Sequence, residues 1–255
     1  MKLIPYMGNK CLAVSAEQNF TVIDCQSLSV ESTIVGYNDE IIDIKHSKTN
    51  PSPYFLMITN SASPKIMNSH SHQLMHLLHG HQDIVLCGQY AHPYLMTAGK
   101  DKVIKLWKMN QAGIPVLIAN YHGHSDDVCG VDWLLKEKLI ISVGEDKMVK
   151  VWPMAEAGSD PVEIHSAMHT IMGHEKTINA VRVSQKESFF ATCSHDRSVK
   201  VWNPQLTCIF TLKGHRRGVW DAAFHDKEAL LVTVAGDGML KGWSMLDGSC
   251  VWSMG

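Results

Sequence analysis

Four Gly-His pairs recur along the chain at nearly even intervals. They begin at Gly80, Gly123, Gly173 and Gly214, so successive copies start 43, 50 and 41 residues apart. This repeat constrains the fold more than any other feature of the sequence. Each copy must form a similar supersecondary unit that buries its apolar surface against the neighbouring copies.

Each pair is followed by a hydroxyl residue, an Asp and a Trp at conserved spacing within the chain. The Trp follows the Asp by six residues in every copy, the hydroxyl precedes the Asp by four residues, and the His precedes it by 20 or 22. The four sets are His81, Thr97, Asp101 and Trp107; His124, Ser142, Asp146 and Trp152; His174, Thr192, Asp196 and Trp202; and His215, Thr233, Asp237 and Trp243.

Short β-rich runs lie between these residues. The run LIISVG, for example, is followed by the polar turn EDK and then by MVKVW, which indicates strand, tight turn and strand. A further strand is predicted before this pair and another after the Trp. Four strands in about 40 residues are typical of a propeller blade. The sequence therefore predicts an all-β propeller.

The predicted blades cover the whole chain but differ in how completely they match the repeat. Residues 36–79 form a degenerate blade in this interpretation, with Gly36-Tyr37 in place of Gly-His and Met67 near the Trp position. Residues 1–35 form a partial blade that lacks its first strand. The regular blades span 80–122, 123–172, 173–213 and 214–255, and the second of these carries a surface-loop insertion at 155–169. The predicted total is about five and a half blades.

The recurring polar residues can form one hydrogen-bond chain in each blade. Trp donates, the hydroxyl donates and accepts, the imidazole bridges, and the Asp accepts. A complete buried network of this kind stiffens a fold. A catalytic Ser/His/Asp interpretation needs one set at an exposed pocket, whereas here the set recurs four times at strand ends. We therefore interpret the network as structural and predict that the protein is not an enzyme and has no small-molecule substrate.

Charge is balanced, with 23 basic and 25 acidic residues. Any contact with nucleic acid must therefore be local. Lys213, Arg216 and Arg217 form the densest basic segment and are a candidate contact for a partner or RNA, although a solvated loop explains them too. The Lys two residues before each Trp is expected to lay its stem along the sheet with its ammonium group in water. These lysines are Lys105, Lys150, Lys200 and Lys241.

Neither metal nor disulfide is predicted. The seven cysteines stand singly at 11, 25, 87, 129, 193, 208 and 250, which favours a reducing compartment and argues against a thiolate zinc site. Histidines cluster at 70, 72, 76, 79 and 81, but no carboxylate or thiolate joins them at ligand spacing. We therefore expect no metal and no cofactor. The first residues have too short an apolar run for a signal peptide, and no later run is long enough to span a membrane.

The Gly-His and Trp units of residues 36–255 resemble the WD-repeat family. Segments such as HLLHGHQDIVLC, GEDKMVKVWPM and GHRRGVWDAAFHDKEALLVTVAGDGMLKGWS are more specifically similar to the mid-section of tandem-propeller proteins of the small-subunit processome. This resemblance implies a nucleolar scaffold in pre-ribosomal RNA processing, with other processome proteins and pre-ribosomal or small nucleolar RNA as partners. It also implies a junction between two propellers within residues 36–90.

One alternative remains open. A generic WD adaptor, such as a ubiquitin-ligase substrate receptor, could read acidic or phosphorylated peptides through Lys176, Arg197, Arg216 and Arg217, and it predicts a cytosolic pool. The chain is also shorter than the family pattern. Open sheet edges are then expected to make it marginally stable or prone to aggregation.

Overall fold

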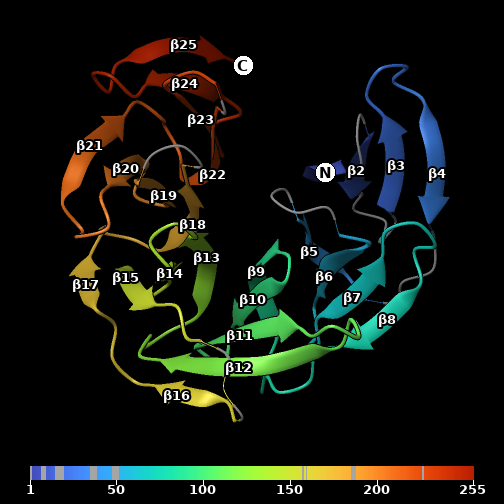
Figure 1. Cartoon of the computed structure of the whole chain (residues 1–255). Helices are drawn as coiled ribbons and strands as arrows, with labels where there is room; N and C mark the ends of the chain where they lie inside the picture. The colour runs from blue at the N-terminus through green and yellow to red at the C-terminus, as the bar shows by residue number, and fades with distance from the viewer. Residues whose placement is uncertain are drawn as a thin grey trace. The chain divides into compact units, whose positions relative to one another are not determined.

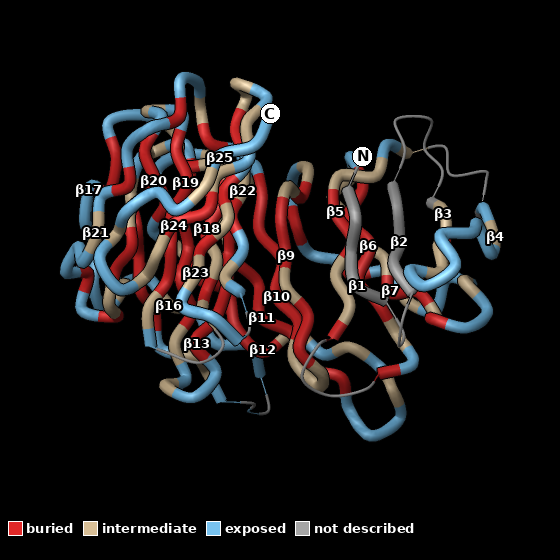
Figure 2. Tube along the Cα trace, turned by 90° about the horizontal axis from the view of Figure 1, so that it is seen from above, coloured by how far each residue is buried: buried red, intermediate tan, exposed pale blue. Residues whose placement is uncertain are grey.

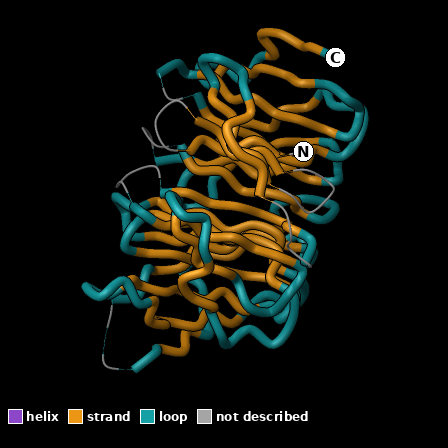
Figure 3. The backbone as a smooth tube through the Cα atoms, turned by 90° about the vertical axis from the view of Figure 1, so that its right-hand side faces the viewer, coloured by secondary structure: helices purple, strands orange, loops and turns teal. Residues whose placement is uncertain are grey.

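The computed structural model describes residues 2–6, 10–14, 20–34, 39–47, 52–156, 158, 160–184, 188–225 and 227–255, with backbone alone for residues 2–6, 10–14, 20 and 34. All regular elements of this part are β-strands (Figure 3). Among these residues, no helix has the length and apolar character needed to cross a membrane.

The strands form six sheets that follow one another along the chain (Figure 1). The first contains β1 (Lys2–Tyr6), β2 (Lys10–Val14), β3 (Phe20–Asp24) and β4 (Val30–Ile34). The second contains β5 (Ile41–His46), β6 (Tyr54–Thr59), β7 (Lys65–Asn68) and β8 (Leu74–Leu77). The third contains β9 (Val85–Ala91), β10 (Tyr94–Gly99), β11 (Val103–Met109) and β12 (Pro115–His122), with β16 (Val162–Ile164) added beside β12.

Three further four-stranded sheets complete the order. The fourth contains β13 (Val128–Leu134), β14 (Leu139–Gly144), β15 (Met148–Pro153) and β17 (His169–Met172). The fifth contains β18 (Ile178–Val183), β19 (Phe190–Ser194), β20 (Ser198–Trp202) and β21 (Cys208–Lys213). The sixth contains β22 (Val219–Phe224), β23 (Leu230–Ala235), β24 (Leu240–Ser244) and β25 (Cys250–Met254).

The chain divides into two compact units. The first comprises residues 1–119 and 157–161, and the second comprises residues 120–156 and 162–255. The division falls inside β12, so the last three sheets belong to the second unit.

The four Trp residues of the repeat occupy equivalent positions. Each lies on the third strand of its sheet and pairs with an apolar residue near the start of the second strand: Trp107 with Leu95, Trp152 with Ile140, Trp202 with Phe190 and Trp243 with Leu231. This register confirms the prediction of an all-β propeller built from successive blades.

The cores lie between successive sheets. One joins Val143 and Val149 of the fourth sheet to Ile178, Val181 and Phe190 of the fifth. Another joins the fifth sheet to the sixth, and a third joins the second sheet to β9, β10 and β11. Figure 2 shows the burial along the inner strands and the exposure of outer strands such as β17 and β21. Each of these three pairs of sheets is therefore stabilised by the apolar core that it shares.

The first blade differs from its prediction. Residues 2–6 form β1, which pairs with β2, so this sheet has four strands rather than three. The prediction was wrong because no motif residue marks the segment. Pro5 is tolerated there since β1 is an edge strand, where a missing N–H can be accommodated. Gly36-Tyr37, predicted to open the next blade, lies outside the described residues.

The insertion at 155–169 is more than a surface loop. Its residues Val162–Ile164 form β16, which extends the third sheet beyond β12. Glu163 fixes this strand, because its carboxylate accepts hydrogen bonds from Asn120 Nδ2 at 2.7 Å and His122 Nε2 at 2.6 Å. The loop prediction was wrong at these residues because the partners of β16 are about 40 residues away in sequence.

The degenerate blade replaces the polar network with methionine. Met67 pairs with Phe55, the register position that Trp occupies elsewhere, and Met57 pairs with Lys65 as the network hydroxyls pair with their lysines. Both methionines are buried. Since both positions carry an apolar side chain, neither needs a hydrogen-bond partner, and a flexible thioether can fill the space.

The cysteine environments predict selective thiol chemistry. Burial, followed by the nearby carboxylates of Glu145 and Asp127, raises the pKa of Cys129 to about 12. Cys25, Cys208 and Cys250 are exposed thiols. Alkylation with iodoacetamide near pH 8 should label these three in the native protein and spare Cys129. Peptide mass spectrometry measures the labelling, and a urea-unfolded sample is the control in which Cys129 should also react.

Candidate functional site

The predicted polar residues meet in each regular blade. In the fifth sheet, His174 lies in the loop before β18, Thr192 on β19, Asp196 in the turn after β19, and Trp202 on β20. His174 Nδ1 is 2.8 Å from Asp196 Oδ2, and its Nε2 is 2.8 Å from Thr192 Oγ1. Trp202 Nε1 donates to the same hydroxyl at 2.9 Å. The Trp, the hydroxyl, the imidazole and the carboxylate thus form a continuous chain.

The other three blades repeat this geometry. The distances from His Nδ1 to the Asp carboxylate are 2.6 Å for His81, 2.7 Å for His124 and 3.2 Å for His215. The His Nε2 and Trp Nε1 atoms of each set both lie 2.7–3.0 Å from its hydroxyl oxygen, which belongs to Thr97, Ser142 or Thr233.

The direction of the hydrogen bonds follows from which groups can donate. The indole only donates, so the hydroxyl accepts from Trp and has one proton to give. When the hydroxyl donates this proton to His Nε2, Nε2 is the acceptor, and the protonated Nδ1 donates to the carboxylate. Burial lowers the pKa of His174, which outweighs the opposing effect of Asp196 and favours this neutral imidazole.

The carboxylate joins two loops. Asp196 accepts hydrogen bonds from the backbone N–H of Glu175 in the loop before β18, and from the N–H and Oγ of Ser198. Burial alone would raise the pKa of Asp196, but hydrogen bonds from Ser198 and His174 lower it to about 2. Asp101 and Asp146 behave alike, since their His partners and backbone donors overcome burial and lower the pKa of each.

These networks are suited to holding the blades rather than to catalysis. Each hydroxyl oxygen is buried and already bonded to both an indole and an imidazole, so it does not face a substrate. We therefore infer that the sixteen network residues tie the loop that enters each blade to the two strands that follow.

The lysine column differs from its prediction. Lys105 and Lys150 are only 7% and 9% exposed, and Lys200 Nζ donates to the carbonyl oxygen of Gly173 at 2.6 Å. The expectation that all four ammonium groups reach water was wrong, because Lys200 bonds to Gly173 in a Gly-His loop and a Cβ on Gly80 would lie 3.8 Å from Lys105 Nζ. Lys241 Nζ donates instead to Ser253 Oγ on β25.

The predicted contact residues lie at one end of the last blades. Lys213 ends β21, and Arg216 and Arg217 follow in the Gly-His loop before β22; all three are exposed. Lys176 and Arg197, the candidates for the adaptor reading, are exposed in the corresponding loop and turn of the fifth sheet. Loops before the first strand and turns between the second and third strands share one end of a blade, so the structure gathers these cations there.

The histidine cluster is dispersed. His70 and His72 lie in the turn before β8, His79 Nδ1 is 3.4 Å from Ser63 Oγ, and His81 belongs to its network. Within the described ranges, no three His, Cys, Asp or Glu side chains are placed to hold a metal ion.

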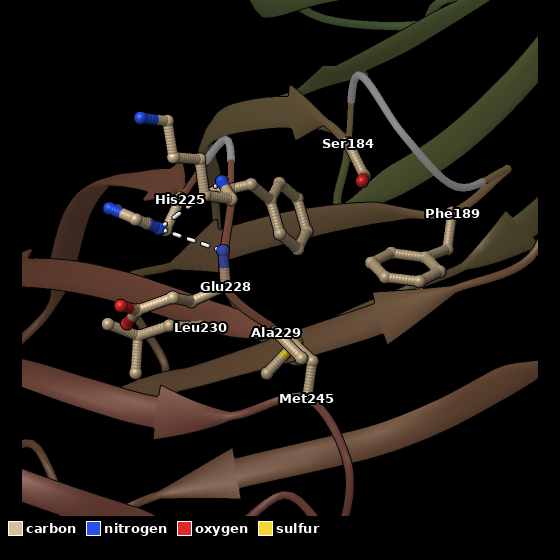
Figure 4. A pocket seen from close by; sticks show the side chains of 9 residues that line it. Ser184, Phe189, His225, Glu228, Ala229, Leu230 and Met245 are labelled. Carbon is tan, nitrogen blue, oxygen red and sulfur yellow. Dashed lines mark hydrogen bonds between the residues drawn. The ribbon is translucent and has the colours of Figure 1, made fainter.

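A cavity of about 180 Å³ lies at the opposite end of the fifth and sixth sheets (Figure 4). Phe189 and Phe224, whose ring centroids are 5.4 Å apart, form its apolar wall with Met245. Nδ1 of His225, at its rim, accepts hydrogen bonds from the backbone N–H groups of Lys227 and Glu228. The same three apolar residues pack against the core between these sheets, so the cavity is the open margin of that core.

Sequence reasoning did not single out Trp220 and His195. Trp220 stands outside the repeat register, and an additional Trp next to the Arg216 and Arg217 segment was the available signal.

The chain matches known proteins over most of its length. The family model described as "WD domain, G-beta repeat" matches residues 72–108, 115–153, 166–203 and 206–244. Each match begins with the outer strand of one sheet and ends on the third strand of the next. The sequence repeat is therefore offset by one strand from the sheet.

Curated relatives match in part of their length. Transducin beta-like protein 3 of Mus musculus is 32% identical over 225 residues, which cover 84% of this chain and 28% of that protein. U3 small nucleolar RNA-associated protein 13 of Saccharomyces cerevisiae is 30% identical over 251 residues, covering 87% of this chain and 30% of that protein. Nuclear distribution protein nudF 1 of Talaromyces marneffei is 27% identical over 248 residues, covering 87% of this chain and 52% of that protein. The chain thus spans less than a third of the first two relatives, and these matches confirm the resemblance drawn from its motifs.

Proposed function

Because this chain belongs to the WD-repeat family of β-propeller proteins, we propose that it is a non-enzymatic scaffold of the small-subunit processome, acting in pre-ribosomal RNA processing and small ribosomal subunit biogenesis. Rigid blades whose polar residues are committed to internal hydrogen bonds leave loops and turns as the binding surfaces. The scaffold holds partners and does not transform a substrate.

One observation carries the processome assignment. The similarity to transducin beta-like protein 3 runs over 84% of the chain, and a yeast relative at comparable identity is named for its association with U3 small nucleolar RNA. A relation confined to the blade motif would match many propeller proteins equally. We accordingly propose a nucleolar location, with other processome proteins as direct partners and pre-ribosomal or small nucleolar RNA in the same assembly.

Affinity purification of a tagged copy tests this proposal. Processome proteins should be enriched, and ultraviolet crosslinking with sequencing should recover pre-ribosomal and U3 RNA. A tagged chain carrying Asp196→Ala, which breaks one blade network, controls for specific capture and should lose the enrichment. If only unrelated partners are recovered with the wild-type chain, the proposal is wrong.

A second candidate is a generic WD adaptor that binds acidic or phosphorylated peptides. The observation that favours it is the group of exposed cations at one end of the fifth and sixth sheets. The exposed side chains of Lys176, Arg197, Arg216 and Arg217 would supply the positive charge. Fluorescence microscopy separates the candidates, since the adaptor predicts a cytosolic pool and the processome scaffold predicts nucleolar signal.

A further inference from the structure

A β-bulge recurs at one position on the first strand of five sheets. In β22, Val219 pairs with Ala235 and Asp221 pairs with Val234, so Trp220 between them has no partner. The same register shift occurs in the second, third, fourth and fifth sheets, where the bulged residues are Ile42, Leu86, Cys129 and Asn179. A bulge re-aims the side chain of the extra residue, and at this position the sixth blade carries the largest aromatic side chain.

Trp220 has an environment unlike that of the repeat Trp residues. It is 51% exposed, whereas the four repeat indoles are buried and donate to hydroxyl oxygens. Among the residues that the structure describes, no hydrogen-bond acceptor is assigned to Trp220 Nε1. An exposed indole gains little for folding, so its presentation at a loop-bearing end indicates a ligand contact.

Two glycines create the space for this aromatic group. The His195 ring meets Trp220 edge to face, with centroids 5.1 Å apart and an interplanar angle of 82°. A Cβ on Gly218 would lie 2.9 Å from His195 Nδ1, and a Cβ on Gly236 would lie 3.0 Å from Trp220 Nε1. The pair is therefore closely fitted between the turn after β19 and the turn after β23.

Three arginines lie at the same end of the blades as the pair. A Cβ on Gly236 would also lie 3.6 Å from Arg217 Cβ, which places Arg217 beside the indole. Arg216 precedes it, and Arg197 is two residues from His195. These are three of the four arginines in the chain. All three are exposed residues, and the described part of the chain shows no ion pair for them.

The remaining charges at this end leave the surface basic. The fourth arginine, Arg182, is paired with Asp221 at 2.7 Å on the first strands. The carboxylates of Asp196 and Asp237 are held by His174 and His215. Among the described residues of the two Gly-His loops and the two turns, the exposed carboxylate is that of Glu175.

We propose that Trp220, His195, Arg197, Arg216 and Arg217 form a binding platform for single-stranded RNA. An exposed indole offers a stacking face for any base, and adjacent guanidinium groups fit phosphate and can also stack on bases. A duplex hides its bases and cannot use the indole. An acidic peptide would need the arginines alone, so it accounts for only part of the surface. The inference rests on this surface chemistry and not on the processome assignment.

Fluorescence anisotropy with a labelled oligouridine of about ten nucleotides tests the platform. Trp220→Ala should weaken binding roughly tenfold, while Trp220→Phe keeps a stacking face and should lose much less. The double variant Arg216→Ala/Arg217→Ala should reduce the slope of log affinity against log salt by about 1.4, since each phosphate contact on a single strand contributes about 0.7. Trp220→Ala should leave that slope unchanged.

Controls separate this site from general charge and from misfolding. Lys227→Ala removes a cation at the opposite end of the sixth sheet and should bind as wild type. Circular dichroism melts should match among the variants, because Trp220 is exposed. Equal RNA affinity of wild type and Trp220→Ala, or no binding by the wild type, would overturn the inference. If polyglutamate displaced the RNA from the wild type, and if polyglutamate binding also required Trp220, the inference would be overturned in favour of an acidic-peptide site.

Discussion

Replacing Trp152 with alanine is expected to lower the free energy of unfolding by about 3–5 kcal/mol, the usual cost of removing a buried Trp. Its side chain is 0% exposed, packs edge to face on Tyr121 with centroids 5.7 Å apart, and donates to Ser142 Oγ at 2.8 Å. Alanine would leave a cavity and remove the donor that Ser142 accepts. Urea unfolding followed by circular dichroism measures the loss without relying on Trp fluorescence.

Two variants calibrate this result. Trp152→Phe keeps much of the packing and loses the indole N–H, so it should cost about 1–3 kcal/mol. Lys150→Ala, on the same strand, removes a side chain whose ammonium group is 3.4 Å from Thr170 Oγ1 and should cost least of the three. Equal losses for Trp152→Ala and Lys150→Ala would contradict the structural role of the network.

Asp196→Ala should cost about 2–4 kcal/mol, because it leaves buried donors without an acceptor. His174 Nδ1 and the Ser198 hydroxyl both bond to this carboxylate, at 2.8 Å and 2.6 Å. The same urea titration measures the effect. A loss no larger than that of Lys150→Ala would show that the blade does not depend on this carboxylate.

The pH dependence gives Asp196 a second signature. Its pKa is about 2 in the folded protein against an ordinary value of 3.8, so the carboxylate stabilises the fold above pH 3.8 and this contribution is lost as pH falls toward 2. The difference in unfolding free energy between wild type and Asp196→Asn should therefore be constant from pH 5 to 7 and shrink below pH 4. A difference that grows on acidification would contradict the assignment.

His174 reinforces the same trend. Burial lowers its pKa below 6.5, so the unfolded chain binds a proton more readily than the folded blade once pH falls below that value. Both groups thus make wild-type stability decline on acidification. The two groups act in different pH ranges, since the carboxylate acts below pH 4 and the imidazole acts at higher pH.

The blade motif was readable from the sequence because its parts are local. His174, Thr192, Asp196 and Trp202 lie within 29 residues, and their spacing recurs in every regular blade. The indole donates, the hydroxyl and the imidazole each donate and accept, and the carboxylate accepts, so these groups can be joined in one chain. The hydrogen bonds of the structure show this chain. The strands could be predicted from β-rich runs and tight turns because these patterns are also local in the sequence.

Features that depend on distant partners could not be read in this way. β16 forms because Glu163 meets Asn120 and His122, about 40 residues earlier, and no pattern within 155–169 signals that pairing. The exposure of the four lysines was misjudged because it depends on segments distant in sequence, such as the Gly-His loop whose Gly173 carbonyl accepts from Lys200 Nζ.

The sequence by itself thus determined the four-stranded unit, its repetition and the family, since spacing and hydrogen-bonding capacity are properties of the residues. Only the tertiary structure decided which side chains are left for a partner. Trp202 and Trp220 are the same residue type in the sequence. Trp202 is buried and donates to Thr192, whereas Trp220 is the extra residue of a β-bulge and lies beside His195 and Arg217. Exposure is set by what the neighbouring blade covers, and that is a property of the packed sheets.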